Sequence, residues 1–154
     1  MEVTRFLRFP PGGLLLSATE TAITGLHFMD EAPKGAGGAS ALLDEAQAQL
    51  LSYFAGERTQ FTLPLAPVGT PFRQKVWAAL MQIPYGQTIT YGELAQAIGN
   101  PKACRAVGGA NHHNPISIFI PCHRVIGQNG SLTGYGGGLH WKEYLLALEA
   151  AHRP

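Results

Sequence analysis

The chain has 154 residues, of which 45% are hydrophobic, and carries a formal net charge of +1. This length suits one core or two small domains that share an interface. No apolar run approaches the ~20 residues that span a bilayer, and the first ten residues lack a signal-peptide pattern, so a cytoplasmic protein without a membrane partner is expected.

The charge is divided unevenly along the chain. Residues 1–66 hold four Lys or Arg against seven Asp or Glu, whereas residues 67–154 hold seven against three. The basic second part is compatible with a polyanionic partner, although many soluble domains carry as much charge.

Cysteine and histidine usage argues against a disulfide framework or a metal site. The only cysteines, Cys104 and Cys122, lie 18 residues apart and form no CxxC motif. His112 and His113 are neighbours, which do not share a face of a helix or strand. No bound metal is therefore expected.

The beginning of the chain is expected to form a small sheet with one helix against it. Three stretches have strand-like composition and are separated by turn residues: 2–9, 14–19 and 22–29. Residues 40–56 have helical composition and end at Gly56, which suits a helix C-cap.

A boundary between two domains is expected near residues 63–71, which contain three prolines and a glycine. The predicted division is a structural α/β domain, residues 1–66, followed by residues 67–154. In the second domain a helix is expected where apolar residues recur at near-helical spacing, at Phe72, Val76, Leu80 and Ile83.

The stretch "TYGELAQAIGNP" predicts two helices joined by a very tight turn. Thr90 and Glu93 fit a capping box, and Gly99 suits the end of the helix that they begin. Asn100 is a good N-cap and Pro101 a good first residue for the next helix. Two short helices in this arrangement are the outline of a helix-turn-helix.

The second of these helices, "PKACRAVGGA", consists mostly of small residues. Two glycines in a helix cost about 1 kcal/mol each relative to alanine, so some other benefit is expected. Tight packing against another helix and close approach to a nucleic acid are both compatible with this composition. The single long cation, Arg105, favours the nucleic-acid surface.

The stretch "FIPCHRVIG" brings a cysteine and a histidine together. Residues 116–120 are expected to form a buried strand or extended segment that carries Cys122 into the interior, where a lone cysteine is usually an inert apolar residue. Adjacent His123, and Glu149 beside the apolar face of the last helix, favour a nucleophile with a Cys-His-Glu relay. Because neighbours in an extended chain point to opposite faces, either the chain bends after Cys122 or a water molecule bridges the pair.

Several ordered motifs together resemble the O6-alkylguanine-DNA alkyltransferases, nearly continuously from Thr70 to Glu149. They are "IPYGQTITYGELA", "GNPKACRAVGGA", the Asn-Pro pair at 114–115, "PCHRV" and "GYGGGLHWKEYLLALE". The resemblance implies an α+β fold. A small N-terminal sheet-plus-helix domain, ribonuclease H-like, would precede a mainly helical winged helix-turn-helix domain.

The resemblance also implies DNA repair by direct reversal of alkylation. The alkyl group of O6-alkylguanine, and of O4-alkylthymine, would pass irreversibly to Cys122, once per protein molecule. No cofactor is expected, because the damaged DNA is itself the alkyl donor. The implied partner is double-stranded DNA containing alkylated bases, bound through its minor groove by a monomer.

Catalytic roles follow from the resemblance residue by residue. Cys122 would attack the alkyl carbon, and a water molecule would link it to His123, which Glu149 holds. Tyr91 would help to rotate the nucleotide out and would protonate the leaving guanine. Asn114 would brace the turns around the site.

Contacts with DNA and with the flipped base follow in the same way. Arg105 would fill the gap left by the extruded base, the thin residues Ala103, Ala106 and Gly108 would let the helix lie close in the groove, and Gln128 would add a further DNA contact. The base pocket would be lined by Asn111, Val125, Tyr135 and Gly136. Asn111 and Gly136 depart from residues found in some members, which leaves the tolerance for large alkyl groups open.

Three other functions compete with this interpretation. A non-catalytic lesion-binding relative would lack the cysteine that is present here. A thiol hydrolase using Cys122, His123 and Glu149 would have no use for a helix carrying Arg105. A plain helix-turn-helix regulator would carry several polar base-reading residues on its recognition helix.

Overall fold

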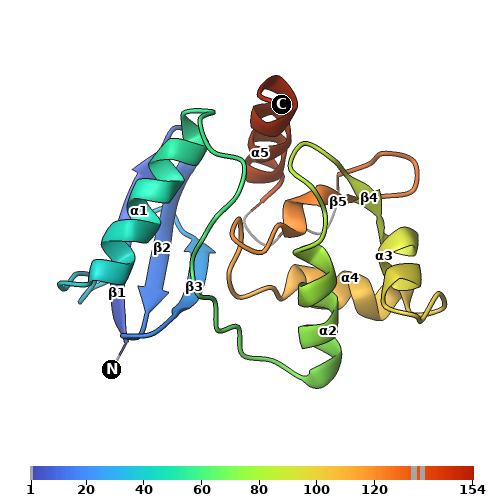
Figure 1. Cartoon of the computed structure of the whole chain (residues 1–154), viewed down its shortest axis with the longest axis horizontal. Coiled ribbons are helices and arrows are strands. Elements are labelled where there is room, and N and C mark those ends of the chain that lie inside the picture. Colours follow the sequence, from blue (N-terminus) through green and yellow to red (C-terminus); the bar gives the residue numbers. More distant parts are fainter. Residues whose placement is uncertain (1, 133–134, 136–137) are drawn as a thin grey trace.

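The computed structural model describes residues 2–132, 135 and 138–154. An antiparallel sheet with one helix over it makes up one side of the molecule, and a group of short helices makes up the other (Figure 1). The C-terminal helix, α5 (Leu139–Ala151), rises between the two sides. The α+β class is confirmed.

The sheet has the strand order β1-β2-β3, with β1 at Val3–Phe9, β2 at Gly12–Ala18 and β3 at Ile23–Phe28. All three strands were predicted from the sequence. The central strand buries Leu14, Leu16 and Ala18 completely, and this alternation places one face of the sheet against the core.

Helix α1 (Ala41–Phe54) covers the sheet and ends as the sequence predicts. The Ser40 hydroxyl accepts a hydrogen bond from the Leu43 amide at 3.0 Å and begins the helix. Gly56, at φ 78°, ends it. There the Glu57 amide donates to the Ser52 carbonyl at 2.9 Å, which closes a Schellman motif. This ending leaves Tyr53 fully buried in the last turn of α1.

The outer edge of β3 is paired with two segments from later in the chain. The Ile23 amide donates to the Pro64 carbonyl at 2.8 Å, and the Leu26 amide donates to the Pro115 carbonyl at 3.0 Å. The Leu26 carbonyl accepts in turn from the Ser117 amide at 3.2 Å. The edge is therefore covered, and the segment that leads to Cys122 is fixed to the sheet.

The second part of the chain is mainly helical. Its elements are α2 (Pro71–Leu80), β4 (Ile89–Thr90), α3 (Tyr91–Ala97), α4 (Cys104–His112), β5 (Val125–Ile126) and α5. The predicted capping box is confirmed, because the Thr90 amide donates to Glu93 at 2.9 Å and the Glu93 amide donates to the Thr90 hydroxyl at 3.1 Å. Helices α3 and α4 form the predicted helix-turn-helix, with β4 and β5 paired in parallel beside it.

Helix α4 begins three residues later than predicted. The Asn100 amide donates to the Ala95 carbonyl at 3.0 Å, so Asn100 completes the end of α3 instead of capping the next helix. A separate turn follows, in which the Ala103 amide donates to the Asn100 carbonyl at 3.0 Å. Ala103 is the N-cap of α4, and its methyl group cannot accept the hydrogen bond by which a side chain caps a helix.

Residues 116–120 are buried as predicted, apart from half-buried Ser117, but they do not form a strand. Ile118 has φ 71°, a left-handed conformation that is a genuine outlier for a β-branched residue. The Phe119 amide donates to the Ser117 carbonyl at 2.9 Å across it, which makes a γ-turn. The segment pairs with the sheet through a single β-bridge, between Ile116 and Leu26. It then folds back on itself through a second bridge, between Ser117 and Ile120.

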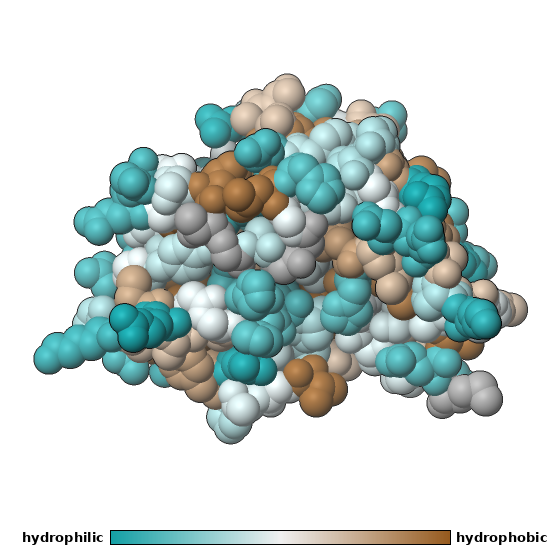
Figure 2. Space-filling model, turned by 180° about the vertical axis from the view of Figure 1, so that it is seen from behind, coloured by the Kyte–Doolittle hydropathy of each residue, from teal (hydrophilic) through white to brown (hydrophobic). Residues whose placement is uncertain are grey.

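The surface shows no single dominant apolar region on the face opposite to Figure 1. Figure 2 shows its hydrophobic residues in separate patches among hydrophilic ones. Over the described residues, no helix combines the length and the apolar character that a bilayer crossing requires.

Replacing Thr90 by Ala should lower the free energy of unfolding by about 1 kcal/mol, because the first turn of α3 loses its capping oxygen. Urea denaturation followed by circular dichroism measures this change. The Thr90→Ser variant keeps the oxygen and serves as the control. Equal stability of the Ala and Ser variants would contradict the capping role.

Candidate functional site

Cys122 lies at the start of a short 3-10 turn, Cys122–Arg124, and is only 3% exposed. Pro121, at φ −79° and ψ 63°, forms an inverse γ-turn in which the Cys122 amide donates to the Ile120 carbonyl at 2.7 Å. The chain therefore bends at Pro121, immediately before the cysteine. An extended arrangement, with Cys122 and His123 on opposite faces, does not occur.

The Cys122 thiol lies in a dry but polar environment. Burial raises its pKa, and this effect is larger than the opposing ones. The groups that act in the other direction are the side chains of Asn114, Ser117 and Tyr135 and the charge of Lys142. The Tyr135 hydroxyl lies close to the Cys122 sulfur, but among the described residues this hydroxyl has no hydrogen-bond partner. At neutral pH the thiol keeps its proton, so its use as a nucleophile requires a base.

Glu149 is the centre of a buried hydrogen-bond network. Its Oε2 atom accepts from the Tyr53 hydroxyl at 2.6 Å, from His123 Nε2 at 2.7 Å and from Arg124 Nη2 at 2.9 Å. Its Oε1 atom accepts from Arg124 Nε at 2.8 Å and from the Gly86 amide at 3.1 Å. A carboxylate beside an apolar helix face needs partners, and the structure supplies donors from three separate segments: α1, the loop that holds Gly86, and the turn that holds His123 and Arg124.

These contacts set the protonation states of Glu149 and His123. Burial by itself would raise the pKa of the Glu149 carboxyl, but the hydrogen bonds and charges of His123 and Arg124 hold it well below its ordinary value. Burial lowers the pKa of His123 despite the nearby carboxylate. A neutral His123 that donates its Nε2 proton to Glu149 leaves Nδ1 as the basic atom. Among the described residues, Nδ1 has no hydrogen-bond partner.

Two asparagines brace the turns around Cys122. The Asn114 amide nitrogen donates to the Ile120 carbonyl at 2.8 Å, and its oxygen accepts from the Ile116 amide at 3.0 Å. The Asn111 amide nitrogen donates to the Cys122 carbonyl at 3.3 Å. Asn111, expected to line the base pocket, thus also holds the backbone of the cysteine.

Lys142 is a site residue that the sequence interpretation missed. It is fully buried, donates from Nζ to the Val125 carbonyl at 2.6 Å, and lies 6.0 Å from the ring centres of both Tyr91 and Tyr135. Burial lowers its pKa, while the nearby Cys122 acts in the opposite direction. The available signal was its place in the last helix, directly after the apolar Trp141.

The sequence interpretation also missed three other residues of the site: Arg124, Tyr53 and Ser117. Arg124 belongs to the "PCHRV" motif, yet no role for it follows from the motif alone. Besides Glu149, it donates from Nη1 to the Ile83 carbonyl at 2.7 Å. Tyr53 lies 96 residues from Glu149 in sequence, and no local pattern connects them.

The exposed side of α4 carries the residues expected to contact DNA. Arg105 and Ala106 are exposed, Ala103 and Gly108 are half-buried, and Val107 faces the core. A Cβ atom on Gly108 would lie 3.9 Å from Tyr91, so the two residues are neighbours. Gln128 lies exposed in the turn after β5. Gly136, expected in the base pocket, lies outside the described residues.

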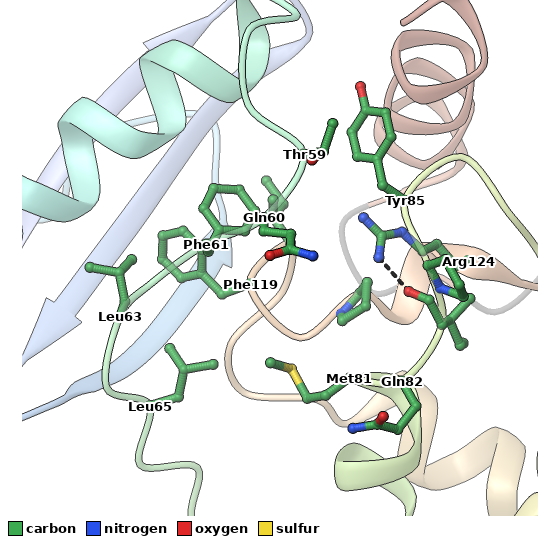
Figure 3. A pocket seen from close by; sticks show the side chains of 14 residues that line it. Thr59, Gln60, Phe61, Leu63, Leu65, Met81, Gln82, Tyr85, Phe119 and Arg124 are labelled. Carbon is green, nitrogen blue, oxygen red and sulfur yellow. Dashed lines mark hydrogen bonds between the residues drawn. The ribbon is translucent and has the colours of Figure 1, made fainter. Parts of the chain in front are cut away.

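A cavity of about 390 Å³ lies beside residues 118–124, the segment that contains Cys122 (Figure 3). Pro121 and Arg124 contribute to its walls, together with Phe61, Tyr85 and Phe119, but Cys122 does not. It is therefore distinct from the environment of the thiol. Among the described residues, no three His, Cys, Asp or Glu side chains are grouped to hold a metal ion.

Comparison with known proteins gives matches along almost the whole chain. The family model "6-O-methylguanine DNA methyltransferase, ribonuclease-like domain" matches residues 3–67, and the DNA binding domain model of the same name matches residues 71–151. The methylated-DNA–protein-cysteine methyltransferase of Methanosarcina acetivorans is 52% identical over 147 residues, which cover 92% of this chain and 94% of that protein.

Solved structures agree with these matches. The Mycobacterium tuberculosis O6-methylguanine methyltransferase is 46% identical, with a TM-score of 0.91 over 100% of this chain and 96% of that one. The Mycobacterium tuberculosis OGT in complex with DNA is 47% identical, with a TM-score of 0.89 over 98% of this chain and 94% of that one.

Replacing Glu149 by Gln should lower the free energy of unfolding at neutral pH by about 3 kcal/mol, because buried Arg124 loses its counter-charge. The depressed pKa of Glu149 stabilises the fold above the ordinary carboxyl pKa of ~4, and this contribution is lost as the pH falls below it. The wild type should therefore lose more stability on acidification than the variant. Urea denaturation at neutral and acidic pH, with exposed Glu143→Gln as control, measures both effects. Equal changes in the free energy of unfolding for Glu149→Gln and Glu143→Gln would contradict the role of Glu149 in this network.

Proposed function

The chain belongs to the 6-O-methylguanine DNA methyltransferase family and acts in DNA repair by alkyl transfer, and on that premise we propose that Cys122 is the alkyl acceptor. The observation that carries this assignment is the position of the thiol. It is buried among polar groups beside a neutral histidine whose Nε2 atom is held by a carboxylate. Cys104, the other cysteine, is exposed on α4 and has no comparable relay.

The proton of the thiol is proposed to pass through a water molecule to Nδ1 of His123. That atom is the free base of the relay, because Nε2 is engaged with Glu149 at 2.7 Å. The imidazolium formed in this step lies beside the negative charge of Glu149, which stabilises it. The thiolate then attacks the alkyl carbon, and one S–C bond forms as the C–O6 bond of the guanine breaks.

The leaving guanine must gain a proton as the C–O6 bond breaks. Tyr91 is the proposed donor, since it begins α3 next to Gly108 and its ring lies 6.0 Å from the Lys142 ammonium. A nearby positive charge favours the ionised form of a phenol. Lys142 therefore assists the transfer of the tyrosine proton to the base.

Access to Cys122 requires the base to leave the DNA helix. The thiol is only 3% exposed, so a base stacked in a duplex does not reach it. We propose that α4 binds the minor groove with its thin face, that Arg105 occupies the place of the extruded nucleotide, and that Gln128 adds a contact to the DNA. Residues 67–154 would carry these contacts, and residues 1–66 would form a structural domain.

The flipped base is proposed to lie against Asn111, Val125, Tyr135 and Gly136. O6-alkylguanine and O4-alkylthymine are the proposed substrates. The product is a thioether, which water does not readily cleave, so each monomer acts once. A non-catalytic lesion binder would have no use for a relay at Cys122, and a thiol hydrolase would have no use for α4.

Mixing the protein with duplex DNA that contains O6-methylguanine should place one methyl group on the peptide that carries Cys122. Mass spectrometry of the digested protein measures this transfer, which should not exceed one equivalent. Cys122→Ser should abolish transfer, while Cys104→Ser should leave it unchanged. Multiple turnovers, or a methyl group on the Cys122→Ser protein, would refute the proposal.

Replacing Arg105 by Ala should slow methyl transfer from duplex DNA by about 10-fold or more, because the extruded state loses the side chain that replaces the base. Transfer from a free O6-alkylguanine base should be unaffected. Lys102→Ala is the control. It should weaken DNA binding in a salt-dependent manner, but at saturating DNA it should transfer the methyl group as fast as the wild type. If Arg105→Ala slows both reactions equally, its proposed role is wrong.

A further inference from the structure

Tyr53 links the N-terminal side of the molecule to the relay. Its hydroxyl donates to Glu149 Oε2 at 2.6 Å, and this same oxygen accepts from His123 Nε2 at 2.7 Å. Both Tyr53 and Glu149 are almost completely buried. Burial and the adjacent carboxylate raise the pKa of Tyr53 well above its ordinary value, so the hydroxyl keeps its proton and remains a donor.

The Tyr53 ring is fixed independently of this hydrogen bond. It lies 5.1 Å from the ring of Phe61 and meets the ring of Tyr85 edge-on at 6.1 Å. Its place at the end of α1 is set by the Schellman motif at Gly56. The tightly packed Tyr53 ring therefore holds its hydroxyl in a fixed place, from which it orients the more flexible side chain of Glu149.

We propose that Tyr53 is a positioning residue for alkyl transfer, which holds Glu149 Oε2 against His123 and limits how strongly that oxygen attracts the imidazole proton. This inference rests on the proposed function of Cys122. A carboxylate has about four acceptor sites, and Glu149 receives five donors. The Tyr53 and His123 hydrogen bonds therefore share the charge of one oxygen, and the strength of one depends on the other.

The charged and titratable groups around His123 set the direction of the effect. Burial is the largest effect and lowers the pKa of His123; Glu149 raises this pKa, and Arg124 and Lys142 lower it. By donating to Oε2, Tyr53 withdraws part of the negative charge that favours the imidazolium. Without the Tyr53 hydroxyl, the pKa of His123 should rise, and Nδ1 should become protonated at a higher pH.

Tyr53→Phe tests this role, with Tyr85→Phe as the matched control. Both variants lose one phenolic oxygen from neighbouring rings, but within the described residues the Tyr85 hydroxyl has no hydrogen-bond partner. Single-turnover methyl transfer to Cys122 is measured with O6-methylguanine duplex and with a free O6-alkylguanine base across the acidic pH range. DNA affinity and the melting temperature are measured in parallel.

Because Glu149 Oε2 is no longer held against His123, and this loss outweighs the more basic imidazole, Tyr53→Phe should slow transfer from both donors by about 3- to 10-fold, with unchanged DNA affinity. The midpoint of the acidic limb should move to higher pH. Tyr85→Phe should match the wild type. Identical rates and pH profiles for the two variants would overturn the proposal, and so would a Tyr53→Phe protein that cannot fold, because the hydroxyl would then be structural. A wild type that transfers no methyl group to Cys122 would instead refute the proposed function.

Discussion

The buried charge of Glu149 is the constraint on which the site depends. A carboxylate in the interior destabilises the fold unless hydrogen bonds and opposite charges surround it. Here the donors come from α1, from the loop before β4, and from both polar residues that follow Cys122. Satisfying this one side chain therefore requires α5 and three other segments to meet, and their meeting fixes the imidazole of His123, the residue after Cys122.

Local signals in the sequence predict the elements well. The capping box at Thr90, the glycines at 56 and 99, and the proline-rich connection before α2 each determine backbone geometry within a few residues. The need of Glu149 for a partner was also predictable, because a carboxylate beside an apolar helix face is unfavourable alone. His123 was proposed as that partner from the adjacent residues themselves, and the resemblance to a known family added the water molecule between His123 and Cys122.

Features that depend on distant residues were not predictable in the same way. Tyr53 and Gly86 reach Glu149 only through the packing of α1 and of the loop before β4 against α5. The β-branched composition of residues 116–120 favours a strand, yet the hydrogen bonds to Asn114 and the turn at Ile118 override it. The start of α4 was misplaced because Asn100 serves the preceding helix instead of the following one.

The pairing of β3 with residues 115–117 makes the two halves of the chain structurally interdependent. A fragment that ends near residue 67 would expose the edge that Pro115 and Ser117 now cover. The complementary fragment would lose the hydrogen bonds that hold Pro115 and Ser117 to Leu26 of β3, and it would lose the Tyr53 donor to Glu149. The halves are thus poor candidates for modular exchange, because a chimera must preserve the seam along β3 as well as the residues that carry the chemistry.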